Sequence, residues 1–340
     1  MRVIPVTEAV GTVLCHDVTR IVPGGEKGPA FRKGHVIRSE DIPALLDIGK
    51  EHLYVLHLPP GMLHENEAAE RMARTATGGG IRCTPVSEGK VNLVADAVGL
   101  LTVNTEGLRH VNAIEGVVFG TLHTHRTVGA GSPVAGTRVI PLVIEEEKIQ
   151  QVEAVCRRYH PLVEIKPFRP WKIGMITTGS EVYHGRIADK FGPVIREKFA
   201  ALGSTVIEQI LVSDDRAMTV AAIHRLIAAG AEMVVATGGM SVDPDDQTPA
   251  SIRAAGGAVV TYGAPVFPGA MFMLAYIGRV PVLGLPGCVM YFRATIFDLI
   301  VSRLLAGETV TREDIIALGH GGFCPACPEC RYPQCGFGKT

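Results

Sequence analysis

The chain has 340 residues, 47% hydrophobic and 20% charged, which is typical of a globular protein with two or three domains and excludes a wholly disordered chain. The net charge of -1 gives no sign of a broad basic surface for nucleic acid, no uncharged apolar run is long enough to span a membrane, and the N-terminus lacks the features of a signal peptide. We therefore expect a cytoplasmic protein that binds neither nucleic acid nor membranes.

Residues 1–60 form the first of four segments and predict a small mixed α+β region. Strands are expected over residues 17–22 and 53–56, and the proline- and glycine-rich residues 23–29 predict a loop. A short helix is expected over residues 39–48, where Ser39 is a suitable N-cap.

Residues 61–165 form a second mixed α+β segment. Helices are expected over residues 65–73 and 145–159, the latter because Ile149, Val152 and Cys156 recur at helical spacing. Strand-like runs, separated by turn residues, cover residues 91–94, 99–103, 117–124 and 137–144. The sequence indicates no function for this segment.

Residues 166–308 predict an α/β domain in which strands alternate with helices. Strands are expected over residues 173–177, 205–212 and 233–236, and helices over residues 194–202 and 217–229. This alternation is typical of a parallel sheet with helices on both faces, and continuous apolar strands fit burial on both sides. We therefore predict a three-layer, doubly wound, mostly parallel α/β fold.

Small and acidic residues follow each of these three strands. They are Thr177, Thr178, Gly179, Ser180 and Glu181; Asp214 and Asp215; and Thr237, Gly238, Gly239 and Ser241, with Asp243, Asp245 and Asp246 close behind. Ligands of open α/β sheets bind at the carboxyl ends of the strands, glycines let a phosphate approach the backbone, and clustered carboxylates suit a hard cation such as Mg²⁺. The alternative is that these glycines form turns and these acids cap helices.

Four stretches in this order resemble the motifs of the molybdopterin-binding domain, which molybdopterin adenylyltransferases, molybdopterin molybdenumtransferases and gephyrin share. They are residues 177–181, residues 214–215, residues 237–241 with Asp246, and residues 285–287. Residues 6–14 and 33–37, with Asp41 and Gly49, more weakly resemble the N-terminal part of the molybdenumtransferases. The family's fold commonly forms homo-oligomers, so the resemblance implies one here.

The resemblance implies a role in molybdenum cofactor biosynthesis. Molybdopterin, or adenylylated molybdopterin, would lie across residues 177–180, Thr237, Gly238, Gly239, Ser241, Pro286 and Gly287. The family positions that match Glu181, Asp214 and Asp246 serve catalysis, and Asp215 and Asp246 would bind Mg²⁺. The implied reaction is Mg²⁺-assisted cleavage of adenylylated molybdopterin as molybdate enters the dithiolene, with release of AMP.

The chain departs from the molybdenumtransferase motifs at three places, the first being residues 24–31, which stand where a Ser-x-x-Asp-Gly-Tyr motif is expected. Cys288, Val289 and Met290 follow Leu-Pro-Gly where the family usually has Asn, Pro and Ser, and Ala270 replaces the lysine of a Pro-Gly-Lys-Pro motif. Loss of that lysine removes a positive contact to an anion. These departures leave open a non-catalytic carrier that delivers the cofactor to a molybdenum client enzyme. We interpret the Cys288 thiol as a packing residue rather than a reactive group.

Residues 309–340 form a tail in which Cys324, Cys327, Cys330 and Cys335 follow the pattern C-x2-C-x2-C-x4-C. Four thiolates at this spacing can converge on a tetrahedral zinc ion, and the close run of three is also similar to iron–sulfur ligation. The alternative is a disordered tail with free thiols behind a flexible hinge at residues 319–322. A third hypothesis for the whole chain is therefore a metal- or redox-sensing interaction protein.

Overall fold

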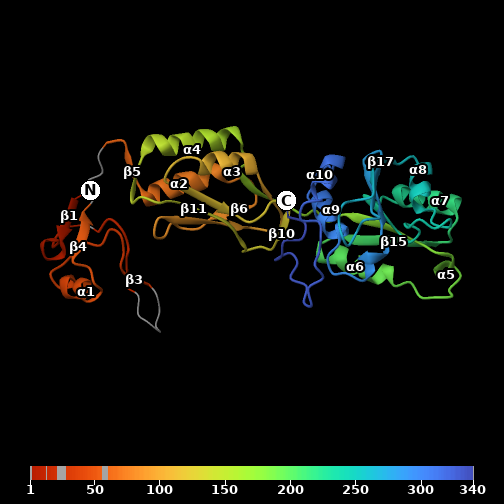
Figure 1. The fold of residues 1–340 in the computed structure, drawn as a ribbon, viewed down its shortest axis with the longest axis horizontal. Helices are drawn as coiled ribbons and strands as arrows, with labels where there is room; N and C mark the ends of the chain where they lie inside the picture. Colours follow the sequence, from red (N-terminus) through yellow and green to blue (C-terminus); the bar gives the residue numbers. More distant parts are fainter. Residues whose placement is uncertain (1, 13, 21–27, 56–59, 340) are drawn as a thin grey trace. The chain divides into compact units, whose positions relative to one another are not determined.

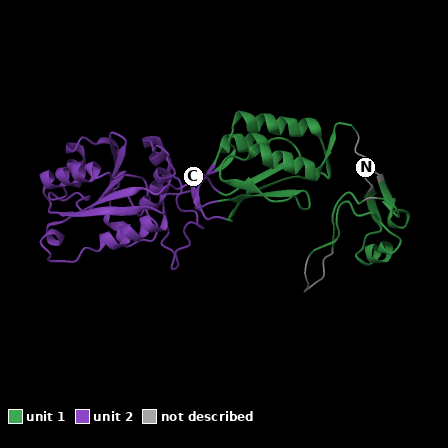
Figure 2. Cartoon of the chain, turned by 180° about the vertical axis from the view of Figure 1, so that it is seen from behind, with its two compact units in different colours: residues 1–96, 103–122, 131–164 green, residues 97–102, 123–130, 165–340 purple. Residues whose placement is uncertain are grey.

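The computed structural model describes residues 2–12, 14–20, 28–55 and 60–339 (Figure 1). Of the loop predicted over residues 23–29, residues 23–27 lie outside these ranges. The chain divides into two compact units, shown in Figure 2: unit 1 comprises Met1–Asp96, Val103–Leu122 and Gly131–Glu164, and unit 2 comprises Ala97–Thr102, His123–Ala130 and Ile165–Thr340. Within the described ranges, no helix has both the length and the apolar character needed to cross a membrane.

The N-terminal part of unit 1 is a small α+β region built from two strand pairs. β1 (Arg2–Pro5) pairs with β4 (His52–Val55), and β2 (Val18–Arg20) pairs with β3 (Gly28–Phe31), both antiparallel. The 3-10 turn η1 (Val6–Glu8) and helix α1 (Asp41–Asp47) pack beside them. The predicted Ser39 cap is wrong: Glu40 is the N-cap, without a side-chain bond, and the Asp41 carboxylate accepts the Arg38 N–H instead.

The rest of unit 1 is an antiparallel sheet with helices α2 and α4 packed side by side (Figure 1). The sheet has the order β6 (Ile81–Cys83), β7 (Lys90–Ala95), β11 (Pro133–Val139), β9 (Val117–Thr121), and β5 (Met62–His64) pairs separately with β12 (Val143–Glu145). The helices are α2 (Glu65–Ala76), α3 (Thr105–Asn112) and α4 (Glu146–Arg158). The strand predicted over residues 137–144 is therefore two strands in different sheets, with Pro141 between them.

Unit 2 contains a six-stranded mixed sheet. Its order is β15 (Thr205–Val212), β14 (Lys172–Thr178), β16 (Met233–Thr237), β19 (Val280–Leu285), β18 (Met273–Ile277), β17 (Ala258–Tyr262). The first four are parallel to one another, and β18 is antiparallel to both of its neighbours. A smaller sheet has the order β10 (Arg126–Val128), β8 (Gly99–Val103), β13 (Val163–Pro167).

Two hydrophobic cores cover the two faces of the six-stranded sheet, because alternate residues of each strand point to opposite sides. Ile173 and Met175 of β14 join one core with residues of α6 (Phe191–Ala201), α9 (Ile296–Leu305) and α10 (Arg312–Ala317). Ile176 joins the other core with residues of α7 (Arg216–Ala228) and α8 (Thr248–Ala254). Helices thus lie on both faces of a mostly parallel sheet, and the predicted three-layer α/β fold is confirmed.

The C-terminal tail packs against the rest of unit 2 and does not follow a flexible hinge. A Cβ on Gly321 would lie 2.3 Å from the Lys339 carbonyl oxygen, and one on Gly322 would lie 2.3 Å from the Leu318 carbonyl oxygen. These glycines are therefore sites of close backbone packing, and the hinge predicted over residues 319–322 is wrong. Phe337, near the end of the chain, is only 4% exposed and belongs to the core.

Candidate functional site

The carboxyl ends of β14 and β16 are joined by buried threonines. Thr177, Thr178 and Thr237 are at most 7% exposed. Thr178 Oγ1 donates to the Thr237 carbonyl oxygen at 3.2 Å, and Thr237 Oγ1 donates to the Ile176 carbonyl oxygen at 3.3 Å. Because buried hydroxyls need partners, these bonds fix the two strand ends to each other. Three of the predicted ligand residues therefore form the rigid floor of the candidate site.

Gly238 and Gly239 form the turn that follows β16. Their φ angles of +84° and +56° lie in the left-handed region that favours glycine. A Cβ on Gly238 would lie 2.3 Å from the Thr178 carbonyl oxygen, and one on Gly239 would lie 2.8 Å from Thr248 Oγ1. The backbone of this turn therefore passes directly against the end of β14. A larger residue at either glycine would displace the neighbouring backbone or side chain.

Ser180 connects the loop after β14 to the loop after β15. It opens the short helix α5 (Ser180–Tyr183), and its N–H donates to Asp214 Oδ2 at 2.8 Å. Glu181 is exposed in the same helix, and its Oε1 lies 3.1 Å from where a Cβ on Gly179 would be. The structure thus brings Ser180 and Asp214 together, with the Glu181 carboxylate folded back toward Gly179.

Asp215 and Asp246, the two predicted Mg²⁺ ligands, each engage one carboxylate oxygen in a local backbone bond. Asp215 is the N-cap of α7, and its Oδ1 accepts the Met218 N–H at 2.7 Å. Asp246 Oδ2 accepts the Asp243 N–H at 3.1 Å and so closes its own loop. The alternative role of these acids, as caps and turn residues, is thus present in the structure.

An open pocket of about 740 Å³ lies beside these loops and is lined by Asp214, Asp215 and Asp245. Arg216 Nη2 donates to Gln247 Oε1 at 3.1 Å and so connects the loops after β15 and β16. Carboxylate oxygens are the ligands that Mg²⁺ prefers, so the donor type suits a hard cation. Across the part of the chain that the structure describes, no three His, Cys, Asp or Glu side chains converge closely enough to hold a metal ion.

Pro286 and Gly287 follow β19, which lies next to β16 with Leu285 opposite Thr237. A Cβ on Gly284 would lie 2.5 Å from Met240 Sδ, so β19 also touches the loop after β16 directly. Pro286 is buried, whereas Gly287 and Ser241 are exposed. The fourth predicted loop is therefore adjacent to the third, as the strand order of the sheet requires.

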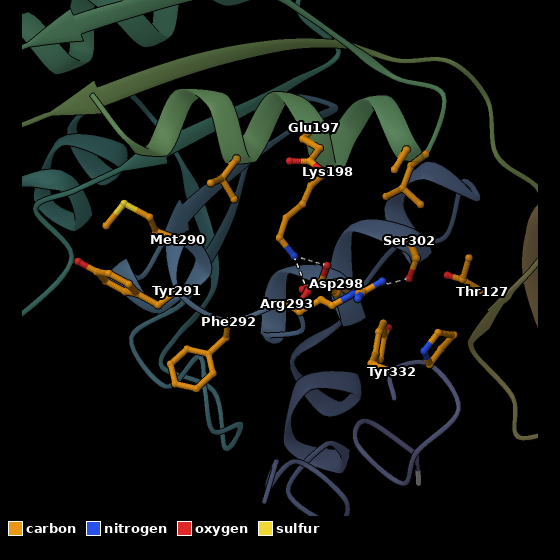
Figure 3. Close-up of a pocket in the computed structure, with 14 residues that line it drawn as sticks. Thr127, Glu197, Lys198, Met290, Tyr291, Phe292, Arg293, Asp298, Ser302 and Tyr332 are labelled. Carbon is orange, nitrogen blue, oxygen red and sulfur yellow. Dashed lines mark hydrogen bonds and ion pairs between the residues drawn. The ribbon is translucent and has the colours of Figure 1, made fainter. Parts of the chain in front are cut away.

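A second pocket, of about 420 Å³, opens beside residues 290–293 (Figure 3). Lys198 Nζ donates to Asp298 Oδ1 at 2.7 Å and to the Arg293 carbonyl oxygen at 2.8 Å. Burial raises the pKa of the Asp298 carboxyl, and the Lys198 ammonium opposes this rise. Figure 3 shows Tyr291 and Phe292 on the side of the pocket opposite Tyr332. The loop that follows Gly287 thus presents two aromatic side chains, 77% and 43% exposed.

Sequence reasoning missed several residues that hold these loops. Thr248 Oγ1 donates to the Gly238 carbonyl oxygen at 2.9 Å, and Gln209 Nε2 donates to Thr177 Oγ1 at 3.0 Å. Thr248 precedes a proline at the start of α8, a pattern typical of the first turn of a helix that could have drawn attention to it. Gln209 lies within a strand, and no sequence signal distinguishes it.

The four tail cysteines line one cavity of about 320 Å³. All four are free thiols; Cys324 and Cys335 are half-buried against the core, and Cys327 and Cys330 are exposed. The structure therefore places the predicted metal ligands around a common space without drawing three of them together in the described residues.

Residues 174–306 match the family described as "Probable molybdopterin binding domain", and residues 3–57 match a "Domain of unknown function (DUF8806)". The chain is 36% identical over 85 residues to a molybdopterin adenylyltransferase of Pyrococcus furiosus, covering 25% of this chain and 50% of that protein. It is 35% identical over 82 residues to a CinA-like protein of Mycobacterium sp. (strain JLS), covering 24% of this chain and 19% of that protein.

Among solved structures, a tungsten cofactor synthesizing protein MoaB from Pyrococcus furiosus is 26% identical, with a TM-score of 0.34, over 40% of this chain and 93% of that chain. The chain spans half or less of the length of these two curated relatives. The resemblance to the molybdopterin-binding domain is confirmed for residues 174–306. The closer resemblance to the molybdenumtransferases stays a prediction.

Proposed function

We propose that residues 166–308 bind molybdopterin or adenylylated molybdopterin, and that the chain takes part in molybdenum cofactor biosynthesis. The match of residues 174–306 to the molybdopterin-binding domain supports this proposal. The observation that carries it is the Gly238–Gly239 turn, whose left-handed backbone lies against the end of β14, at the edge of the sheet where open α/β folds bind their ligands.

The proposed ligand lies across the four neighbouring strand ends, with its phosphate at the glycine turn. The chain would contribute the backbone of residues 177–180, of Thr237, Gly238, Gly239 and Ser241, and of Pro286 and Gly287. Mg²⁺ held by Asp215 and Asp246 would neutralise phosphate charge and polarise the bond that is cleaved. Glu181 and Asp214, on the loops after β14 and β15, and Asp246 are the proposed catalytic acids.

The test of turnover is AMP release from adenylylated molybdopterin in the presence of Mg²⁺ and molybdate. We expect the wild-type chain to release AMP and Asp246→Asn to lose the activity while remaining folded. Asp243→Asn is the matched control, because it changes an exposed carboxylate of the same loop and should retain activity. Activity that survives Asp246→Asn would remove the proposed role of Asp246.

A non-catalytic carrier is the second candidate, and Ala270 at the position of the family's lysine favours it. No AMP release by a wild-type chain that still binds the pterin would support carriage to a molybdenum client enzyme. A chain that neither releases AMP nor binds pterin would refute the proposed function and favour the metal- or redox-sensing alternative. We expect the chain to form a homo-oligomer, which sedimentation analysis of the purified protein would test.

A further inference from the structure

The C-terminal tail is held against the α/β domain by a short parallel contact and by an aromatic anchor. The Phe267 N–H donates to the Gly322 carbonyl oxygen, and the Cys324 N–H donates to the Phe267 carbonyl oxygen, each at 2.8 Å. Tyr332 packs on the core, and its ring meets the Phe337 ring edge-on, with 6.2 Å between the ring centroids. Cys324 and Cys335 therefore start from fixed positions at the two ends of the cysteine pattern.

The cavity beside Cys324 and Cys335 is lined by all four tail cysteines and by two cationic side chains. Besides the cysteines, its lining includes Arg293 and Arg331 and the aromatic rings of Phe292 and Tyr332. A zinc ion with four thiolates carries a net charge of about -2, which two guanidinium groups would offset. The cavity of about 320 Å³ exceeds what a tetrahedral centre with Zn–S bonds of about 2.3 Å requires.

We propose that Cys324, Cys327, Cys330 and Cys335 form a zinc-thiolate site that restrains residues 292–294. Cys327 and Cys330 are exposed on residues 325–331, which form no helix or strand, so their approach to the two half-buried thiols would break no helix or strand. Ala326, between the first two cysteines, has a φ of +52° and turns the chain sharply there. Zinc binding displaces the thiol protons and closes this segment over the cavity.

The restrained segment is the continuation of the proposed ligand loop. Phe292, Arg293 and Ala294 line the cysteine cavity, and only four residues, 288–291, separate them from the Pro286–Gly287 turn, where η2 (Gly287–Met290) begins. Lys198 already holds the Arg293 carbonyl oxygen from the other side. Zinc would therefore fix this segment from the tail side; its relevance to pterin binding rests on the proposed function of that turn.

The first measurement is the zinc content of the full-length protein, purified under reducing, oxygen-free conditions with zinc supplied. We expect one zinc per wild-type chain, none in the Cys327→Ser/Cys330→Ser double variant, and full retention in Cys83→Ser, which removes an exposed thiol of unit 1. Tryptophan fluorescence equal to that of the wild type would show that the double variant is folded. A wild-type chain without zinc, a double variant that keeps zinc, or iron with acid-labile sulfide instead would overturn the proposal.

The second measurement is tryptic cleavage after Arg293, which is exposed on the restrained segment. Loss of zinc should speed this cleavage about tenfold, because proteolysis follows the population of the locally opened state. Equal rates in the wild type and the double variant would overturn the restraint. Neither measurement needs a pterin, so a chain that binds zinc but no pterin would refute the proposed function and leave the metal site standing.

Discussion

The Lys198–Asp298 ion pair makes a strong prediction, because it is the charged contact between α6 and the N-terminus of α9. The two side chains are 15% and 16% exposed, and Lys198 Nζ lies 2.7 Å from Asp298 Oδ1. Lys198→Met keeps most of the side-chain volume and removes the charge, which leaves a buried carboxylate without its cation. Breaking a buried pair in this way costs about 3–5 kcal/mol. We expect a loss of that size in the free energy of unfolding at neutral pH.

The pH dependence follows from the pKa of Asp298. Burial raises this pKa in the folded chain, and removal of the Lys198 ammonium, which lowers it, raises it further. The folded variant then binds a proton more tightly than the unfolded chain does, so its stability increases as pH falls through the folded pKa and decreases as pH rises. The destabilisation should therefore be larger at pH 8 than at pH 5.

Urea unfolding followed by tryptophan fluorescence measures this loss. Trp171 is the only tryptophan of the chain and packs on the core of unit 2, so the signal reports on this unit. Lys190→Met, an exposed lysine just before α6, should change stability by less than about 0.5 kcal/mol. Adding Asp298→Asn to Lys198→Met should recover much of the loss, because the amide oxygen can still accept the Thr295 N–H. A loss under about 1 kcal/mol, or one that does not vary with pH, would refute the reasoning.

Two further predictions concern backbone and histidine positions. Gly238→Ala should lower the free energy of unfolding of unit 2 by more than about 2 kcal/mol in the same urea assay, because the new Cβ would meet a carbonyl oxygen in a left-handed turn. Gly287→Ala is the control and should have little effect, because a Cβ there has open space. In unit 1, His64 Nδ1 accepts the Asn66 N–H and contacts Lys33 Nζ at 2.8 Å, and burial, with Lys33, lowers the pKa of His64. Because the folded chain favours neutral His64, its free energy of unfolding should decrease as the pH falls below about 6.5. Amide hydrogen exchange of α2, corrected for intrinsic rates, should therefore accelerate below this pH in the wild type and not in His64→Gln.

The sequence predicted the helices and strands in which apolar residues recur at a regular spacing and recognisable residues mark both ends. In α4, Ile149, Val152 and Cys156 all face the core, as their spacing predicts. Helix α3 was missed because Gly107 lowers its helix propensity. A Cβ there would lie 2.7 Å from Tyr159 Cβ, so that glycine is required by packing against a residue distant in sequence. Local propensity does not contain such a contact.

The same holds for the candidate site: its contiguous motifs could be predicted from the sequence, whereas its contacts between distant residues could not. Each strand-end motif is contiguous, so Thr237, Gly238 and Gly239 could be identified from the sequence and placed at the end of a strand. Their partner Thr248 lies on a different element, and its bond to the Gly238 carbonyl oxygen depends on how α8 returns to the sheet. The motifs thus indicate where a ligand would bind, whereas the residues that make the turn rigid emerge only from the fold.

Cys288 bears on whether the proposed pterin ligand would be turned over or only carried. Cys288 is half-buried in η2, and burial raises the pKa of its thiol. Because the thiolate is the nucleophilic form, a raised pKa keeps this residue protonated and unreactive at neutral pH. Cys288 therefore adds no reactive group to the loop after Gly287. The decision between transferase and carrier then falls on the carboxylates of the loops after β14, β15 and β16, which is why Asp246→Asn is the decisive variant.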